Sequence, residues 1–79
     1  MRVPGHPRID IDPEICSGKP CVAGTRMRAA DILRGLSSGD TEEDLLESFP
    51  YLSLEDIRAC LAFAAYVTAQ PVALAEAAE

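Results

Sequence analysis

The chain has 79 residues, of which 48% are hydrophobic and 25% are charged, and its formal net charge is −6. These values lie near globular averages and exclude a wholly disordered chain, but a domain of this length buries only about 60% of the surface that its unfolded chain exposes. We therefore expect one small domain with a marginal core, which binds a second copy of itself or another protein.

Charge is distributed unevenly along the chain. Residues 1–39 contain six Lys and Arg against four Asp and Glu, whereas residues 40–79 contain one Arg against nine acids. The first half is therefore net positive and the second half strongly negative. Contacts with phosphate groups are expected through the first half only.

The cysteines and the apolar stretches indicate the cellular compartment in which the protein is expected. Three cysteines, an odd number without a secretory signal, argue against a disulfide framework and favour a reducing compartment. The N-terminal residues lack the apolar core of a signal peptide, and the uncharged stretch 59–75 is short for a membrane span and contains Pro71. We expect a cytoplasmic protein with no membrane segment.

The first predicted elements precede a helical region. Residues 1–8 are rich in Pro and Gly and have little to bury, so they are predicted to be a mobile lead-in to a single domain over residues 9–70. Residues 9–11 alternate apolar and acidic side chains and predict a short strand, which Asp12 and Pro13 end in a turn.

A tight β-hairpin is predicted next. Residues 20–22 and 25–27 are short β-tolerant runs joined by Ala23 and Gly24, and a glycine can adopt positive φ without steric cost. The composition then changes to a helical spacing of apolar residues, so the hairpin is expected to lead directly into a helix.

Three helices are predicted from residues that typically cap or stop a helix. The first begins after Arg28 and ends at Gly39, which can adopt the left-handed conformation. The second begins at Asp40 or Thr41, where Thr41 offers an N-cap hydroxyl followed by three acids, and stops at Pro50. The third begins after an N-cap at Ser53. The short link between the last two helices suits a helix-turn-helix crossing.

The third helix is apolar on nearly all sides, more than three helices of a small domain can cover. We therefore predict that its outer side is an interface with a second copy or a partner. The residues predicted for this interface are Cys60, Phe63, Tyr66 and Val67. Pro71 is predicted to end the helix, so that residues 71–79 form a small, Ala-rich tail.

No catalytic, cofactor or metal site is predicted. Gly18 and Lys19 lack the upstream glycine and the following hydroxyl residue of a phosphate-binding loop. Cys16 and Cys21, with His6 as the one further ligand, do not match the ligand number or spacing of structural zinc sites. A His–Cys catalytic pair would require a firmly held histidine. We expect that the protein is not an enzyme.

The most specific local signal is Gly24-Thr25-Arg26, a turn followed by a permanently charged, planar side chain. Arg26 is expected to clamp a carboxylate as a structural brace, with contact to a ligand or nucleic acid as the alternative. The candidate carboxylates are those of Asp10, Asp31 and Asp56. If DNA is bound, acids at the start of the third helix would repel its backbone. The residues then expected to contact it are Lys19, Arg26, Arg28 and Arg34.

Several blocks in order resemble a known family. GKP at 18–20, GTR at 24–26, FPYL at 49–52 and EDIRA at 55–59 are similar to the small bacterial proteins catalogued as domain of unknown function 433, over about residues 9–66. The resemblance implies a mainly α fold, with a short N-terminal β-hairpin before a three-helix, homeodomain-like helix-turn-helix core. It also implies an antitoxin encoded beside a PIN-like ribonuclease toxin.

Our leading hypothesis is a type II antitoxin-like homodimer. Its apolar, acidic C-terminal half would bind and neutralise a PIN-like ribonuclease toxin. Complementary electrostatic potentials on two proteins speed their association and fix the orientation in which they bind. Autoregulation through operator DNA is a further expectation. The alternatives are a stand-alone DNA-binding transcriptional regulator and a plain dimerisation module.

Overall fold

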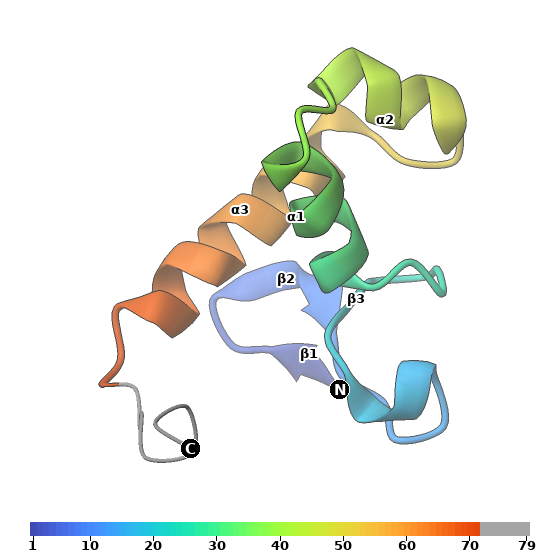
Figure 1. Ribbon diagram of the computed structural model, residues 1–79. Helices are drawn as coiled ribbons and strands as arrows, with labels where there is room; N and C mark the ends of the chain where they lie inside the picture. Colours follow the sequence, from blue (N-terminus) through green and yellow to red (C-terminus); the bar gives the residue numbers. More distant parts are fainter. Residues whose placement is uncertain (72–79) are drawn as a thin grey trace, which may run out of the picture.

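The computed structural model describes residues 1–71, in which a small sheet precedes three helices (Figure 1). Most of the predicted tail, residues 72–79, lies outside the described residues. The strands are β1 (Arg2–Val3), β2 (His6–Asp10) and β3 (Cys21–Val22), with the 3-10 helix η1 (Cys16–Gly18) between the last two. The helices are α1 (Ala29–Ser37), α2 (Glu42–Ser48) and α3 (Leu54–Thr68).

The three strands form one antiparallel sheet in the order β1-β2-β3. Ile9 of β2 lies opposite Val22 of β3, and both side chains are buried. This register places the apolar side of the sheet against the helices. The strand predicted at residues 9–11 therefore exists, although it begins three residues earlier and ends one residue earlier.

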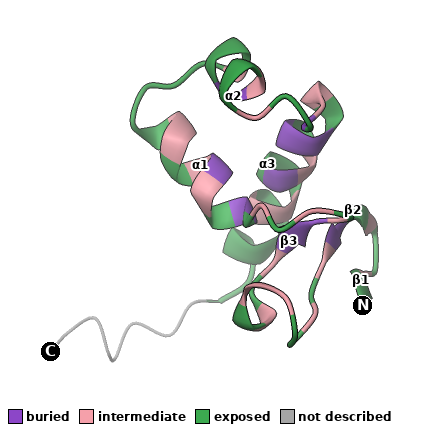
Figure 2. Ribbon diagram, turned by 90° about the vertical axis from the view of Figure 1, so that its right-hand side faces the viewer, coloured by how far each residue is buried: buried purple, intermediate pink, exposed green. Residues whose placement is uncertain are grey.

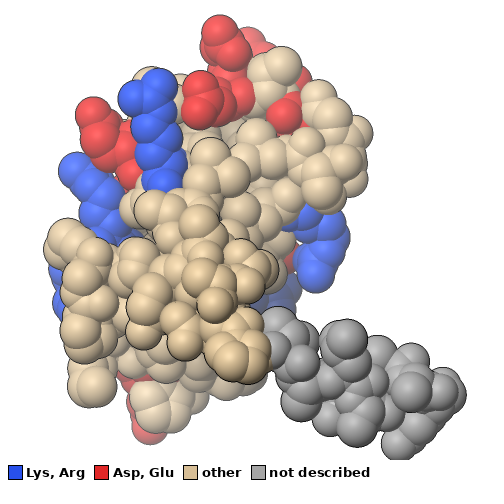
Figure 3. Space-filling view, turned by 90° about the vertical axis from the view of Figure 1, so that its left-hand side faces the viewer, with Lys and Arg blue, Asp and Glu red and all other residues tan. Residues whose placement is uncertain are grey.

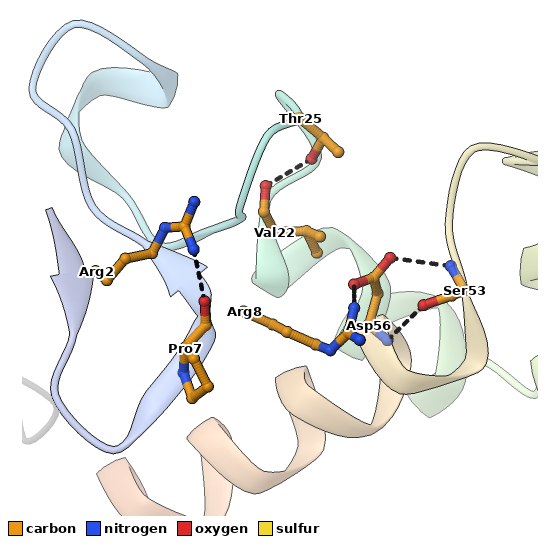
Figure 4. A network of polar contacts seen from close by, with 7 residues as sticks. All are labelled: Arg2, Pro7, Arg8, Val22, Thr25, Ser53 and Asp56. Carbon is orange, nitrogen blue, oxygen red and sulfur yellow. Dashed lines mark hydrogen bonds and ion pairs between the residues drawn. The ribbon is translucent and has the colours of Figure 1, made fainter.

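Residues 1–8, expected to be a mobile lead-in, instead belong to the sheet. They form β1 and the first three residues of β2. Gly5, at a φ of 81°, lies in the turn between the two strands. The Arg2 guanidinium donates a hydrogen bond to the Pro7 carbonyl across the strand pair at 2.9 Å (Figure 4). Pro7 lies in the central strand, beside a register shift in the β1–β2 pair, and proline is tolerated at such irregularities.

The predicted hairpin after η1 forms in part. Its turn is present, with Gly24 at a φ of 80° and the Val22 N–H donating to the Met27 carbonyl at 2.9 Å. Its first strand, β3, pairs with β2. The second predicted strand is reduced to a single bridge between Cys21 and Arg28, because α1 begins at the next residue.

The helix ends agree with the prediction. Thr41 caps α2 and Ser53 caps α3, and in each capping box the third helical residue, Asp44 or Asp56, bonds back to the N–H of the cap. A cap of this kind contributes about 1 kcal/mol. After α1, Gly39 adopts a φ of 103°.

The core lies where the sheet meets the helices, and Figure 2 shows buried residues on the strands and on all three helices. Its members are Ile9, Val22, Ala29, Ile32, Leu45, Leu52, Ile57 and Cys60. Leu52 and Ile57, which lie on either side of the N-cap Ser53, both belong to it. The fold is therefore mainly α with a small N-terminal sheet. None of the helices in residues 1–71 combines the length and apolar character that crossing a bilayer requires.

Candidate functional site

The C-terminal half of α3 exposes apolar surface without any charged side chain. Between Ala59 and Thr68 the sequence contains no Asp, Glu, Lys or Arg. We call the exposed part of this stretch the α3 face, namely Leu61, Tyr66 and Val67, which are 44%, 52% and 46% exposed, with Ala62 and Ala65. Figure 3 shows a broad uncharged area on this side of the molecule, with charged residues at its edges.

An apolar groove of about 220 Å³ adjoins the α3 face and is lined by residues of both α1 and α3. Its walls include Leu33 of α1 and the residues Phe63 and Val67 of α3. The hydroxyl of Thr68, at its edge, donates its proton to the Ala64 carbonyl at 2.8 Å and so has none left to donate to a ligand. The α1–α3 groove can therefore accept an apolar side chain but offers little to a polar one.

The four residues predicted for the interface lie in different places. Tyr66 and Val67 are exposed, and the half-buried Phe63 lines the groove. Cys60 has no exposed surface and belongs to the core, where burial and the nearby Asp56 carboxylate raise the pKa of its thiol to about 11. The expectation that Cys60 faces outward is therefore wrong. When a helix is apolar on nearly all sides, its spacing does not reveal which side packs inward.

Leu61 is a surface residue that the sequence analysis missed. It was not among the residues predicted for the interface, yet 44% of it is exposed. Ile57, one turn earlier in α3, is fully buried. Leu61 follows the fully buried Cys60 by one residue, about 100° around the helix, and so lies at the margin of the buried side of α3.

His6 connects the β1–β2 pair to α3 through aromatic contacts. Its ring lies 5.4 Å from Phe63 in an edge-on arrangement, and 5.1 Å from Tyr66 in a tilted one. Such pairs contribute about 0.5–1.5 kcal/mol beyond their buried area. The β1–β2 turn therefore supports the position of Tyr66 on the α3 face.

The structural brace expected from Arg26 is made by another arginine. Arg8 of β2 donates to one oxygen of Asp56 at 2.9 Å, and the other oxygen accepts the Ser53 N–H at 2.9 Å (Figure 4). Asp56 is 9% exposed, so the pair ties the sheet to the first turn of α3. The prediction for Arg26 is wrong, because its exposed turn lies outside ion-pair distance of the described carboxylates.

The four cations predicted to contact DNA lie on α1 and in the segment before it. Arg28 and Arg34 share the Asp31 carboxylate, at 3.2 and 3.1 Å. Lys19 and Arg26 are exposed and have no ion-pair partner among residues 1–71. One carboxylate therefore serves two guanidinium groups, and the region keeps a net positive charge.

The thiols and acids of the described chain do not converge on a metal. No group of three or more His, Cys, Asp or Glu in residues 1–71 is arranged to hold an ion. Cys16 donates to the Arg26 carbonyl at 3.2 Å. The pKa of the Cys21 thiol is raised to about 12, mainly by burial and to a smaller extent by a hydrogen bond with Cys16. Burial and this hydrogen bond both disfavour a reactive thiolate at Cys21.

The fold and these surfaces define a small, mainly α domain, and comparison places it in a family. The family described as "Protein of unknown function (DUF433)" matches residues 9–64, and the chain belongs to it. The crystal structure of a DUF433 member from Anabaena variabilis is similar, with a TM-score of 0.68 and 27% sequence identity over 71% of this chain and 55% of that one.

A protein of Sinorhizobium fredii is also similar. The uncharacterized protein y4eO is 36% identical over 50 residues, which make up 63% of this chain. The matched region is 23% of y4eO, so the present chain spans only about a quarter of the length of that relative.

Proposed function

We propose that this protein is an antitoxin-like binding protein whose α3 face and α1–α3 groove bind another protein. The observation that carries the proposal is the exposure of Leu61, Tyr66 and Val67 on a half-helix without charge. Exposed apolar side chains that gather on one side of a small domain, with a polar rim, are typical of protein-binding sites. Tyr66 is a suitable anchor because tyrosine is enriched among residues that dominate binding energy.

The proposed partner is a PIN-like ribonuclease toxin, the class that the family resemblance implies. Charge complementarity supports this choice. Glu43, Glu47 and Glu55 are exposed on α2 and the first turn of α3, and acids lie along the upper edge of the uncharged area in Figure 3. An enzyme that binds RNA presents a basic surface, which this acidic edge would steer and orient.

A direct binding experiment tests the proposal. The protein is mixed with the PIN-like protein encoded nearest to its gene, and complex formation and RNA cleavage are measured together. We expect a complex that suppresses cleavage, and loss of both effects when Leu61→Glu and Val67→Glu are combined. Ile11→Glu is the matched control, because Ile11 is 37% exposed but lies outside the α3 face.

The outcomes separate the alternative occupants of this surface. A double variant that binds the toxin as tightly as wild type would contradict the proposal. Homodimerisation remains a prediction, tested by light scattering of the protein alone. A dimer that Leu61→Glu and Val67→Glu convert to a monomer would identify a second copy as the occupant of the α3 face and would overturn the assignment of that face to a toxin.

Operator binding is a second proposed function, supported by the cations around α1. In the homeodomain-like helix-turn-helix that the resemblance implies, α3 would enter the major groove, but Glu55 and Asp56 lie in its first turn. We therefore propose that Arg34 of α1, Arg28 at its N-cap, and the preceding Lys19 and Arg26 contact DNA phosphates.

Salt dependence tests the DNA contact. The affinity for the DNA upstream of the gene should fall steeply as the salt concentration rises. Combining Arg28→Gln with Arg34→Gln should reduce the slope of log affinity against log salt concentration by about two, because two phosphate contacts are lost. Arg2→Gln, at the β1 edge of the sheet, is the control. No shift of DNA at low salt, or an unchanged slope in the double variant, would rule out this surface.

A further inference from the structure

A second groove, of about 560 Å³, lies beside the sheet and shares no residue with the α1–α3 groove. We call it the sheet groove. Its walls include the Gly24-Thr25-Arg26 turn and the side chains of Arg2, Asp10 and Asp12. We propose that the sheet groove binds a carboxylate group, from a small acid or from the end of a peptide, through the guanidinium groups of Arg2 and Arg26.

Arg26 is presented by a turn whose backbone is already held in place. The Thr25 hydroxyl donates to the Val22 carbonyl at 2.8 Å (Figure 4) and accepts the Met27 N–H at 3.0 Å. The Cys16 thiol donates to the Arg26 carbonyl at 3.2 Å. The side chain of Arg26 is itself exposed and makes no hydrogen bond or ion pair within residues 1–71. Binding would therefore order one side chain rather than a loop.

Arg2 reaches the same groove from β1. One of its nitrogens donates to the Pro7 carbonyl at 2.9 Å, which orients the guanidinium (Figure 4). Because a guanidinium carries five N–H donors, most of them remain for a ligand. No carboxylate of the described residues lies within ion-pair distance of Arg2. The two arginines that line the sheet groove are thus both without a carboxylate partner in residues 1–71.

The two acids of the groove do not cancel the charge of its arginines. Asp10 pairs with the N-terminal ammonium at 2.8 Å, which compensates its charge. The Asp12 carboxylate accepts the Glu14 N–H at 2.8 Å and stays in the wall of the groove. Two guanidinium groups therefore oppose one uncompensated carboxylate, and the groove attracts an anion. The planar guanidinium fork can hold a carboxylate through two parallel hydrogen bonds, which is why we choose this ligand group.

Nuclear magnetic resonance titration of the full chain tests the proposal. The ligand is N-acetyl-Ala-Val-Ala with a free carboxylate, compared with its C-terminal amide, acetate and inorganic phosphate. We expect saturable shifts of the Arg26 and Arg2 side-chain N–H signals with the free acid, and binding at least about tenfold weaker with the amide. Acetate as tight as the peptide would identify small acids as the source, whereas a tighter peptide would identify peptide ends, and both results support the site.

Variants connect the shifts to the groove. Arg26→Gln should weaken binding at least about tenfold without unfolding the protein, because its guanidinium makes no contact to lose. Arg26→Lys should bind less tightly than wild type, since lysine lacks the planar fork. Arg34→Gln on α1 should bind as wild type.

Two results would overturn the proposal. The first is equal binding of the acid and the amide, or undiminished binding by Arg26→Gln. The second is tighter binding of phosphate than of the peptide acid, which would refute the choice of a carboxylate.

Discussion

The two ends of α3 are built in opposite ways. At the N-terminal end Asp56 is nearly buried, and Arg8 and Ser53 donate to both of its oxygens. At the C-terminal end Tyr66 and Val67 are about half exposed to water. A polar group is thus buried at one end while apolar groups are exposed at the other, which reverses the usual preference. We conclude that the first end holds the domain together, and we propose that the second binds a partner.

The largest expected effect comes from truncating a buried apolar residue of α3, compared with an exposed one of the same helix. Ile57→Ala should destabilise the protein by about 3 kcal/mol, because Ile57 is 0% exposed and its loss leaves a cavity in the core. Leu61→Ala, one turn later and 44% exposed, should change stability by less than about 1 kcal/mol. Urea denaturation measures both. Equal losses would show that the exposed residue is as important to the fold as the buried one.

Removing the carboxylate at the N-terminal end should have a slightly smaller effect. Asp56→Ala deletes the bonds from Arg8 and Ser53, and we expect a loss of about 2 kcal/mol in the free energy of unfolding. Glu55→Ala, at an exposed position of the same helical turn, is the matched control and should change it by less than about 0.5 kcal/mol. If the two variants unfolded at the same urea concentration, the brace would have no role in stability.

The smallest effect concerns Asp44, the exposed counterpart of Asp56 in the capping box of α2. Hydrogen bonds from Thr41 lower the pKa of Asp44 below its usual 3.8. A lowered pKa in the folded state stabilises the protein above the unfolded-state pKa, and this contribution is lost as pH falls through the folded-state value. Unfolding by urea between pH 5 and pH 2 should therefore show a flatter pH dependence in Asp44→Asn than in wild type. Parallel curves would contradict this.

Local structure was predictable because it depends on residues close in sequence. The caps at Thr41 and Ser53 bond to groups three residues away, and the turn at Gly24 requires only one positive φ. Hydrogen bonds over so few residues are visible as spacing in the chain. The three helices and the β3 turn were therefore predicted close to where they occur.

The candidate sites were predicted less well, because they depend on contacts between distant segments. The interface prediction named Tyr66 and Val67, which are exposed, but also Cys60, which is buried, and omitted Leu61. Arg26 was expected to be the brace, but its freedom from ion pairs within residues 1–71 is what makes the sheet groove a candidate site.

By itself, the sequence determined where the helices begin and end, that one long helix is apolar almost all round, and that its charge lies at its start. Only the tertiary structure decided that Arg8 meets Asp56 across 48 residues, that β1 joins the sheet, and which side of α3 stays in water. The physical reason is that a capping bond needs only neighbouring residues, whereas an ion pair or a buried face depends on how the whole chain packs.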